Sequence, residues 1–175
     1  MRNNWFSPKM LLAYAAVLLV IAWRVFTEIP NFTPVMALAF FGGAYFGKKH
    51  IALILPFSAM IISDLILGLH ATMLYVYVAF ALAVGVGVWL RNRLSVWSII
   101  GGALGSSVIF FVLTNLGVWI TGMVGYPMNV GGLMACYTAA IPFFRTEVIS
   151  TLVFSGVFFG AYYAMKSYSR SFASA

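Results

Sequence analysis

Apolar residues fill long stretches of this chain, and polar residues gather in the short gaps between them. Six apolar segments stand out, at residues 10–26, 33–47, 51–69, 71–90, 95–120 and 146–166. A helix needs about 20 apolar residues to cross the hydrocarbon of a bilayer, and all but one of the segments are near that length. The pattern therefore predicts an all-α polytopic membrane protein, with six transmembrane helices in a single domain over residues 1–175.

The short segment, 33–47, has a well-marked start. Thr33 is a good N-cap residue, and Pro34 fits the first turn of a helix. A helix this short must tilt little, thin the bilayer or be shielded by its neighbours. We expect one of these three to apply.

The stretch 131–144 is apolar but too short for a span, and Pro142 lies near its end. Counting it as a seventh span would place Lys166 on the outer side. We therefore expect an interfacial or re-entrant segment on the outer face. The last helix would then begin near Arg145, where Glu147 suits the helix dipole.

The basic residues predict the orientation, because cytoplasmic connections of membrane proteins are rich in Lys and Arg. With the N-terminus inside, only Arg24 and Arg145 of the ten basic residues fall outside. The other eight fall on the cytoplasmic side: Arg2, Lys9, Lys48, Lys49, Arg91, Arg93, Lys166 and Arg170. We expect a multi-pass protein of the bacterial inner membrane with both termini in the cytoplasm and an uncleaved first helix.

Composition supports the lipid bilayer as the main partner. Hydrophobic residues make up 63% of the chain and charged residues 7%, against about 25% charged in soluble domains. The net charge of +7 follows from topology, so it does not predict nucleic-acid binding. The single cysteine, Cys136, excludes an intrachain disulfide framework. No HExxH, GxSxG or P-loop motif is present, and we expect no enzymatic activity, no cofactor and no metal.

Varied polar residues lie in the outer connections and the outer half of the spans. Asp64 is the only acid in the middle portion of a span, where ionised groups usually face a partner or a cavity. It has three open interpretations: a packing contact with an arginine or with backbone amides, a ligand contact, or ion or proton coupling. Asn115 and Trp119 share a helix face. The predicted ligand-binding residues are Arg24, Asn31, Asp64, Asn115, Trp119, Tyr137 and Arg145.

Each of these residues also has a structural explanation. Trp119 and the outer tyrosines are typical of the interfacial aromatic belt, and Arg24 can extend its side chain to the interface. His70 fits a solvated loop, and Cys136 fits a small buried residue or, less readily, a soft metal ligand.

Small residues recur at the spacing of close helix packing. Gly43 and Gly47, Gly101 and Gly105, and Gly156 and Gly160 form GxxxG motifs. Ala79, Ala83 and Gly87 continue the pattern in the segment 71–90. They predict close contacts within the bundle or between two copies of the chain.

Four segments carry a resemblance: NFTPVMALAFFGGAYF at 31–46, SDLILG at 63–68, TNLGVW at 114–119 and CYTAAIPFFR at 136–145. The chain resembles a family of small, uncharacterised bacterial six-helix membrane proteins. More distantly, its layout is similar to the substrate-binding S components of energy-coupling-factor (ECF) transporters. Those components bind vitamins or metals near the outer surface and are driven by separate coupling subunits.

The resemblance implies an S-component-like bundle that takes up a small vitamin-like solute. It also implies an ECF-type energy-coupling module as partner. However, the AxxxA docking pattern of S components is absent from the first helix, since Val17 stands four residues after Ala13. Two alternatives from other classes remain, a non-catalytic structural or assembly protein and a small membrane enzyme acting on lipid.

Overall fold

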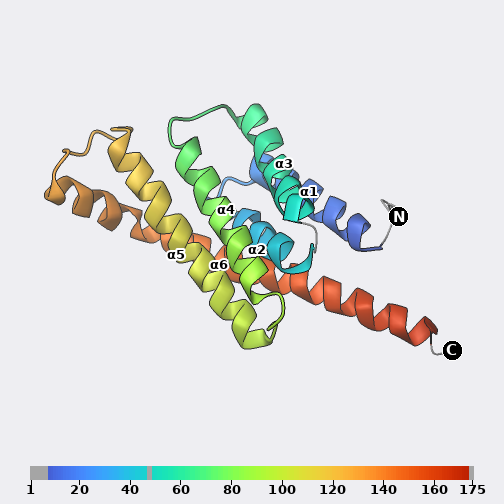
Figure 1. Cartoon of the computed structure of the whole chain (residues 1–175). Helices are drawn as coiled ribbons and strands as arrows, with labels where there is room; N and C mark the ends of the chain where they lie inside the picture. Colours follow the sequence, from blue (N-terminus) through green and yellow to red (C-terminus); the bar gives the residue numbers. More distant parts are fainter. Residues whose placement is uncertain (1–7, 47–48, 174–175) are drawn as a thin grey trace.

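The computed structural model describes residues 8–46 and 49–173, with side chains at 10–46 and 53–168 (Figure 1). These residues form six helices and no strand, which confirms the all-α class. The helices are α1 (Pro8–Phe26), α2 (Val35–Tyr45), α3 (Lys49–Leu67), α4 (Met73–Leu90), α5 (Val96–Ile120) and α6 (Val130–Ala173). Several basic residues used for the orientation lie outside the described backbone or side chains, namely Arg2, Lys9, Lys48, Lys49 and Arg170.

Three helices are long and apolar enough to cross a membrane. They are α4, α5 and the stretch Val130–Tyr168 of α6. The apolar stretches Met10–Phe26, Val35–Tyr45 and Leu53–Leu67 are shorter. The number of spans that the sequence predicts, six, therefore stays a prediction.

Helix α2 lies at the centre of the bundle and contacts all five other helices (Figure 1). Every residue from Val35 to Ala44 is buried, as expected for a helix that is apolar on all sides. Its 11 residues extend only about 16 Å. This burial agrees with shielding by neighbours, one of the three expected ways to accommodate a short helix. Thr33 does not cap it: α2 begins at Val35, after Pro34, without a side-chain cap.

The contact between α2 and α4 depends on small residues. A Cβ atom at Gly43 would collide with the carbonyl oxygen of Val84, and one at Gly87 with that of Phe40. Two glycines facing each other's backbones thus allow the axes to approach closely. Arg91, beyond the end of α4, donates hydrogen bonds to the carbonyl oxygens of Gly43 (3.1 Å) and Phe46 (3.0 Å). A cation at these last carbonyls stabilises the C-terminus of α2.

The other GxxxG pairs behave differently. A Cβ atom at Gly101, Gly105, Gly156 or Gly160 would meet nothing within 4 Å. Packing inside the bundle therefore does not explain these two motifs, whereas Gly47 lies outside the described residues.

Helix α6 joins two segments that the sequence separates. The stretches 131–144 and 146–166 belong to one continuous helix of 44 residues, so the helix does not restart near Arg145. Pro142 removes one helical hydrogen bond without ending the helix. Packing holds both sides of it: Cys136 and Glu147 are buried, and Phe144 stacks against Phe111 of α5 with ring centroids 4.5 Å apart.

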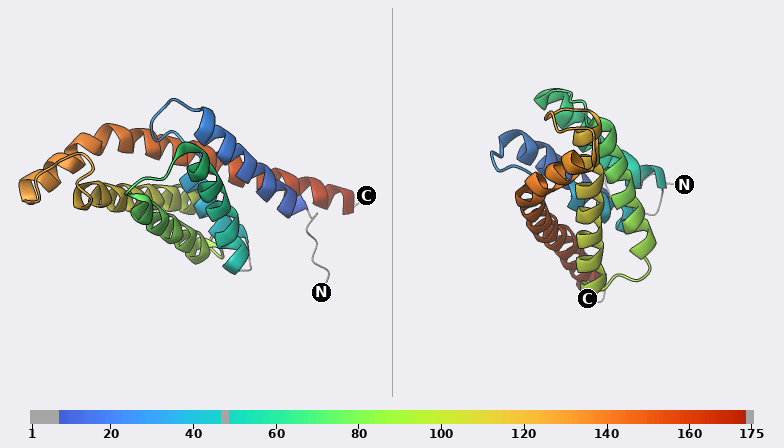
Figure 2. Two further views of the ribbon diagram at one scale, coloured as in Figure 1. Left: turned by 90° about the horizontal axis from the view of Figure 1, so that it is seen from above. Right: turned by 90° about the vertical axis from the view of Figure 1, so that its left-hand side faces the viewer.

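The length of α6 shapes the whole molecule. At 1.5 Å per residue it measures about 66 Å, roughly twice the thickness of a bilayer's hydrocarbon core. Figure 2 shows it following an arched path, with its C-terminal end projecting past the other helices. Its first third packs on the C-terminal half of α5, and its middle part packs on α2.

Candidate functional site

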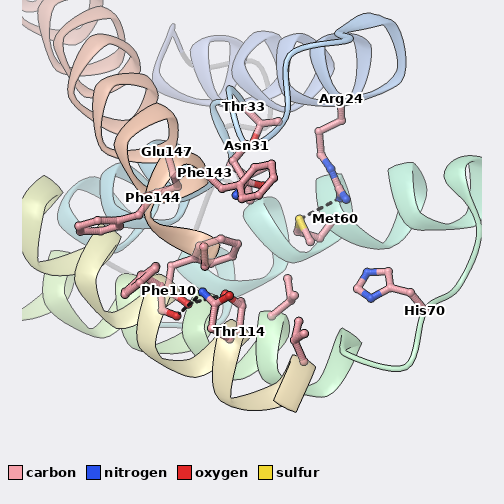
Figure 3. A pocket seen from close by; sticks show the side chains of 16 residues that line it. Arg24, Asn31, Thr33, Met60, His70, Phe110, Thr114, Phe143, Phe144 and Glu147 are labelled. Atoms are coloured by element: carbon pink, nitrogen blue, oxygen red, sulfur yellow. Dashed lines mark hydrogen bonds between the residues drawn. The ribbon is translucent and has the colours of Figure 1, made fainter. Parts of the chain in front are cut away.

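A cavity of about 320 Å³ opens at the end of the bundle where the α1–α2, α3–α4 and α5–α6 connections lie. Its polar lining comes from separate elements: Arg24, Asn31, Thr33, His70, Thr114, Asn115 and Glu147. Figure 3 shows Arg24, Met60 and His70 toward one end of this cavity and Phe144 and Glu147 toward the other. A mostly apolar hollow of this size with a few polar groups is typical of a small-molecule site.

Arg24 is held by α3 at one end of the cavity. Its guanidinium lies 2.8 Å from the carboxylate of Asp64 and 2.7 Å from the hydroxyl of Ser63. It also contacts the sulfur of Met60 at 3.1 Å. Tyr77 of α4 donates a hydrogen bond of 2.9 Å to the other carboxylate oxygen of Asp64. The ion pair therefore ties α1, α3 and α4 together.

This geometry supports the packing interpretation of Asp64. The carboxylate is only 1% exposed and does not line the cavity, whereas Arg24 is 16% exposed and does. The packing contact with an arginine is thus present, and Arg24 is the member of the pair that a ligand would touch.

The C-terminal half of α5 forms one wall. Thr114 and Asn115 line the cavity, but each side chain donates to a carbonyl oxygen four residues earlier, at 2.8 Å. These bonds satisfy the Thr114 hydroxyl donor and one of the two N–H donors of Asn115 within the helix. Asn31, in the α1–α2 connection, also lines the cavity and has a φ of 58°. Asparagine tolerates this left-handed conformation better than most residues, so the backbone alone favours it there.

Aromatic rings cover much of the remaining wall. Phe110 and Phe111 come from α5, and Phe143 and Phe144 come from α6. Phe143 and Phe144 stand four and three residues before Glu147, which places all three on neighbouring parts of one helix face.

Glu147 is the residue whose importance the sequence did not indicate. It lies deep within α6 instead of at a helix start, lines the cavity, and is 5% exposed. One carboxyl oxygen, Oε1, accepts a 2.7 Å hydrogen bond from Thr151, whereas buried Oε2 has no hydrogen-bond partner among the described residues. The Ser107 hydroxyl lies close to this carboxyl group, and its oxygen is likewise buried without a hydrogen-bond partner among the described residues. The helix-dipole explanation fails because α6 begins at Val130, nearly five turns before Glu147.

Three predicted ligand residues lie away from the cavity lining. Trp119 donates its indole N–H to the carbonyl oxygen of Pro127 (3.0 Å), and Tyr137 donates its hydroxyl to that of Val112 (2.7 Å). The Tyr137 bond joins α6 to α5, and the Trp119 bond joins α5 to the α5–α6 connection. Arg145 is exposed and does not line the cavity. Of the seven predicted residues, the cavity therefore brings together Arg24, Asn31 and Asn115, with Asp64 behind Arg24.

His70 and Cys136 differ in their surroundings. His70 lines the cavity, and its Nδ1 lies 2.9 Å from the hydroxyl of Thr72, so it is more than a solvated loop residue. Cys136 is 2% exposed, with its sulfur 3.5 Å from the carbonyl oxygen of Asn115. Within the described part of the chain, no three His, Cys, Asp or Glu residues are grouped closely enough to hold a metal ion.

The sequence profile of one family matches residues 4–173. The chain belongs to DUF6580, a family of unknown function. Comparison with curated proteins and with solved structures gives no match. Membership in DUF6580 agrees with the resemblance to an uncharacterised family, and it carries no information about bacterial origin or about the S components of ECF transporters.

Proposed function

We propose that this protein binds a small, vitamin-like solute in the cavity and mediates its uptake across a bacterial inner membrane. The observation that carries the proposal is the cavity itself, about 320 Å³, with polar groups from α1, α5, α6 and two connections set in an apolar wall. Chemistry on the solute is not part of the proposal.

The proposed topology has six spans with both termini in the cytoplasm. In this arrangement the three connections around the cavity are the outer ones, so the cavity opens away from the cytoplasm. Arg91 and Arg93 lie in the α4–α5 connection, at the opposite end of the bundle, and Lys166 lies in the C-terminal part of α6. The buried, lipid-shielded position of α2 accommodates a helix that is too short to span alone.

An S-component-like arrangement is part of the same proposal. It rests on size, helix number and the elaborated end of the bundle. The lack of AxxxA in α1 argues against docking of an ECF-type coupling module through that pattern. We therefore propose the solute as the primary partner, with opening and closing of the outer connections allowing entry and release.

The test is a native mass measurement on the protein purified in mild detergent. We expect a retained small molecule. The variant Val118→Phe places a larger side chain on the cavity lining of α5 and should abolish retention. Val108→Phe is the matched control, since Val108 is on the same helix and 49% exposed away from the cavity. Absence of any retained molecule from the wild-type protein, or equal retention by both variants, contradicts the proposal.

A structural or assembly protein is the second candidate, and one observation favours it. The polar contacts of Arg24 are all internal, to Met60, Ser63 and Asp64, so this network stabilises the bundle without any solute. In that case Asp64→Asn would lower the yield of folded protein, and no ligand would be found. A membrane enzyme acting on lipid would instead show product turnover.

A further inference from the structure

One oxygen of the Glu147 carboxyl group, Oε2, is an acceptor without a hydrogen-bond partner among the described residues, in a residue that lines the cavity. This oxygen is buried, although the residue lines a space of about 320 Å³. A buried acceptor that stays unbonded costs roughly 1–3 kcal/mol, and more when the group is charged. Such a group in a cavity is explained when a ligand supplies the missing donor.

The charges around the cavity favour a positive ligand. Arg24 lines the cavity but is already paired with Asp64 at 2.8 Å. Arg145, the other cation near this end, is exposed and absent from the lining. Glu147 therefore has no ion-pair partner among the described residues, and an anionic solute would meet no arginine or lysine in the lining other than the paired Arg24.

The walls next to Glu147 favour a flat ligand. Phe143 and Phe144 lie on the same helix face as Glu147, and Phe111 stacks on Phe144 at 4.5 Å. Aromatic faces attract cations as well as planar rings. A carboxylate beside such faces is suited to a planar cation with N–H donors.

We infer that the solute is a planar organic cation whose N–H groups donate to Glu147 Oε2 while its ring packs on the phenylalanine wall. This inference rests on the proposed function and narrows the solute to one chemical class. An anionic or uncharged solute would instead depend on the Arg24 end of the cavity.

Three probes of nearly equal shape test the class. Benzamidine is a planar cation, benzamide is its neutral counterpart, and benzoate is an anion. Equilibrium dialysis against the wild-type protein in neutral detergent, with protein-free micelles as the blank, gives the three affinities. We expect benzamidine to bind at least about tenfold more tightly than benzamide, as for a charge-assisted hydrogen bond, and benzoate not to bind.

Glu147→Gln then tests the residue. This substitution keeps the shape of the side chain and removes its charge. The affinity for benzamidine should therefore fall at least about tenfold and approach the affinity for benzamide. Glu28→Gln is the matched control, because Glu28 is exposed in the α1–α2 connection and does not line the cavity. The three probe affinities are measured on the wild-type protein, so they test the preference for a cation even if Glu147→Gln does not fold.

Different outcomes separate this inference from the proposed function. Benzoate binding as tightly as benzamidine, or a benzamidine preference that survives Glu147→Gln, overturns the inference alone. A retained native solute that is neutral or anionic does the same. Failure of all three probes to bind, together with no retained molecule in the native mass measurement, overturns both.

Discussion

Asp64 and Glu147 show how different two buried carboxyl groups are at the residue scale. Asp64 is 1% exposed and faces Arg24 and Tyr77, so both of its oxygens have partners. Glu147 is 5% exposed and has a partner at one oxygen only. The first arrangement is complete within the protein, whereas the second is completed by a ligand in our proposal.

Substituting Arg24 should destabilise the protein more than substituting Asp64, although either change breaks the ion pair. Arg24→Gln leaves a buried carboxylate without its cation, and we expect a loss of about 3 kcal/mol in the free energy of unfolding. Asp64→Asn should cost less, because Arg24 is partly exposed and keeps Ser63. The double variant should be more stable than the sum of the single losses predicts.

Unfolding by SDS in mixed micelles measures these differences. Arg93→Gln is the control for loss of an arginine, since Arg93 is exposed in the α4–α5 connection. Strictly additive losses in the double variant would show that the two groups do not interact.

At the scale of elements, the position of α2 depends on how closely α4 approaches it. Gly43 and Gly87 each face backbone of the other helix, and α2 has no polar face with which to contact water. A larger side chain at Gly43 or Gly87 should therefore destabilise the bundle, whereas a larger side chain at the outward-facing glycines should not.

Gly87→Ala should test that crossing. The added methyl group collides with the carbonyl oxygen of Phe40, so we expect a loss of at least about 2 kcal/mol and a lower midpoint of thermal unfolding in detergent. Gly85→Ala, two residues earlier on α4, meets nothing within 4 Å. It should be neutral or stabilising, since alanine favours helix. Equal effects of the two variants would rule out close packing as the cause.

The start of α5 is fixed by a local motif. Ser95 accepts a hydrogen bond from the backbone N–H of Ser98, and the Ser98 hydroxyl accepts one from the backbone N–H of Ser95. Ser95→Ala should lower the free energy of unfolding by about 1 kcal/mol. Thr138→Ala is the comparison, because its hydroxyl bonds a carbonyl within a helix and does not cap an end. A Ser95→Ala variant as stable as the wild type contradicts the capping role.

At the scale of the whole molecule, the cavity and most of the located basic residues lie at opposite ends of the bundle. Arg91, Arg93 and Lys166 are at the end away from the α5–α6 connection, and Arg24 is beside the cavity. This separation agrees with the proposed orientation, in which the site faces outward.

Single cysteines test the orientation directly. In a Cys136→Ala background, Asn92→Cys introduces a thiol in the exposed α4–α5 connection and Met128→Cys one in the exposed α5–α6 connection. We expect a membrane-impermeant maleimide to label Met128→Cys in intact cells and Asn92→Cys only after the membrane is opened. Labelling of both thiols from the same side would mean that α5 does not cross.

Much of the element pattern was predictable, because apolar runs and turn residues are local properties of the chain. The first five segments correspond to α1–α5, with ends that differ by a few residues, and the sixth, 146–166, is part of α6. The largest difference is the continuity of α6 through Pro142. Burial against α5 on both sides of the proline keeps that stretch helical, and such contacts are not visible in the local sequence.

For the site, the sequence by itself determined that polar groups gather toward one end of an apolar bundle, since charge and hydropathy follow position along the chain. It also singled out Asp64, with an arginine as one of several candidate partners. The tertiary structure alone decided that this arginine is Arg24, that Arg145 points away, and that Glu147 lines the cavity. The reason is physical: the partner of a buried polar group depends on the rotation and crossing of helices packed against it, and those follow from contacts such as Gly43 with Gly87 that join distant parts of the chain.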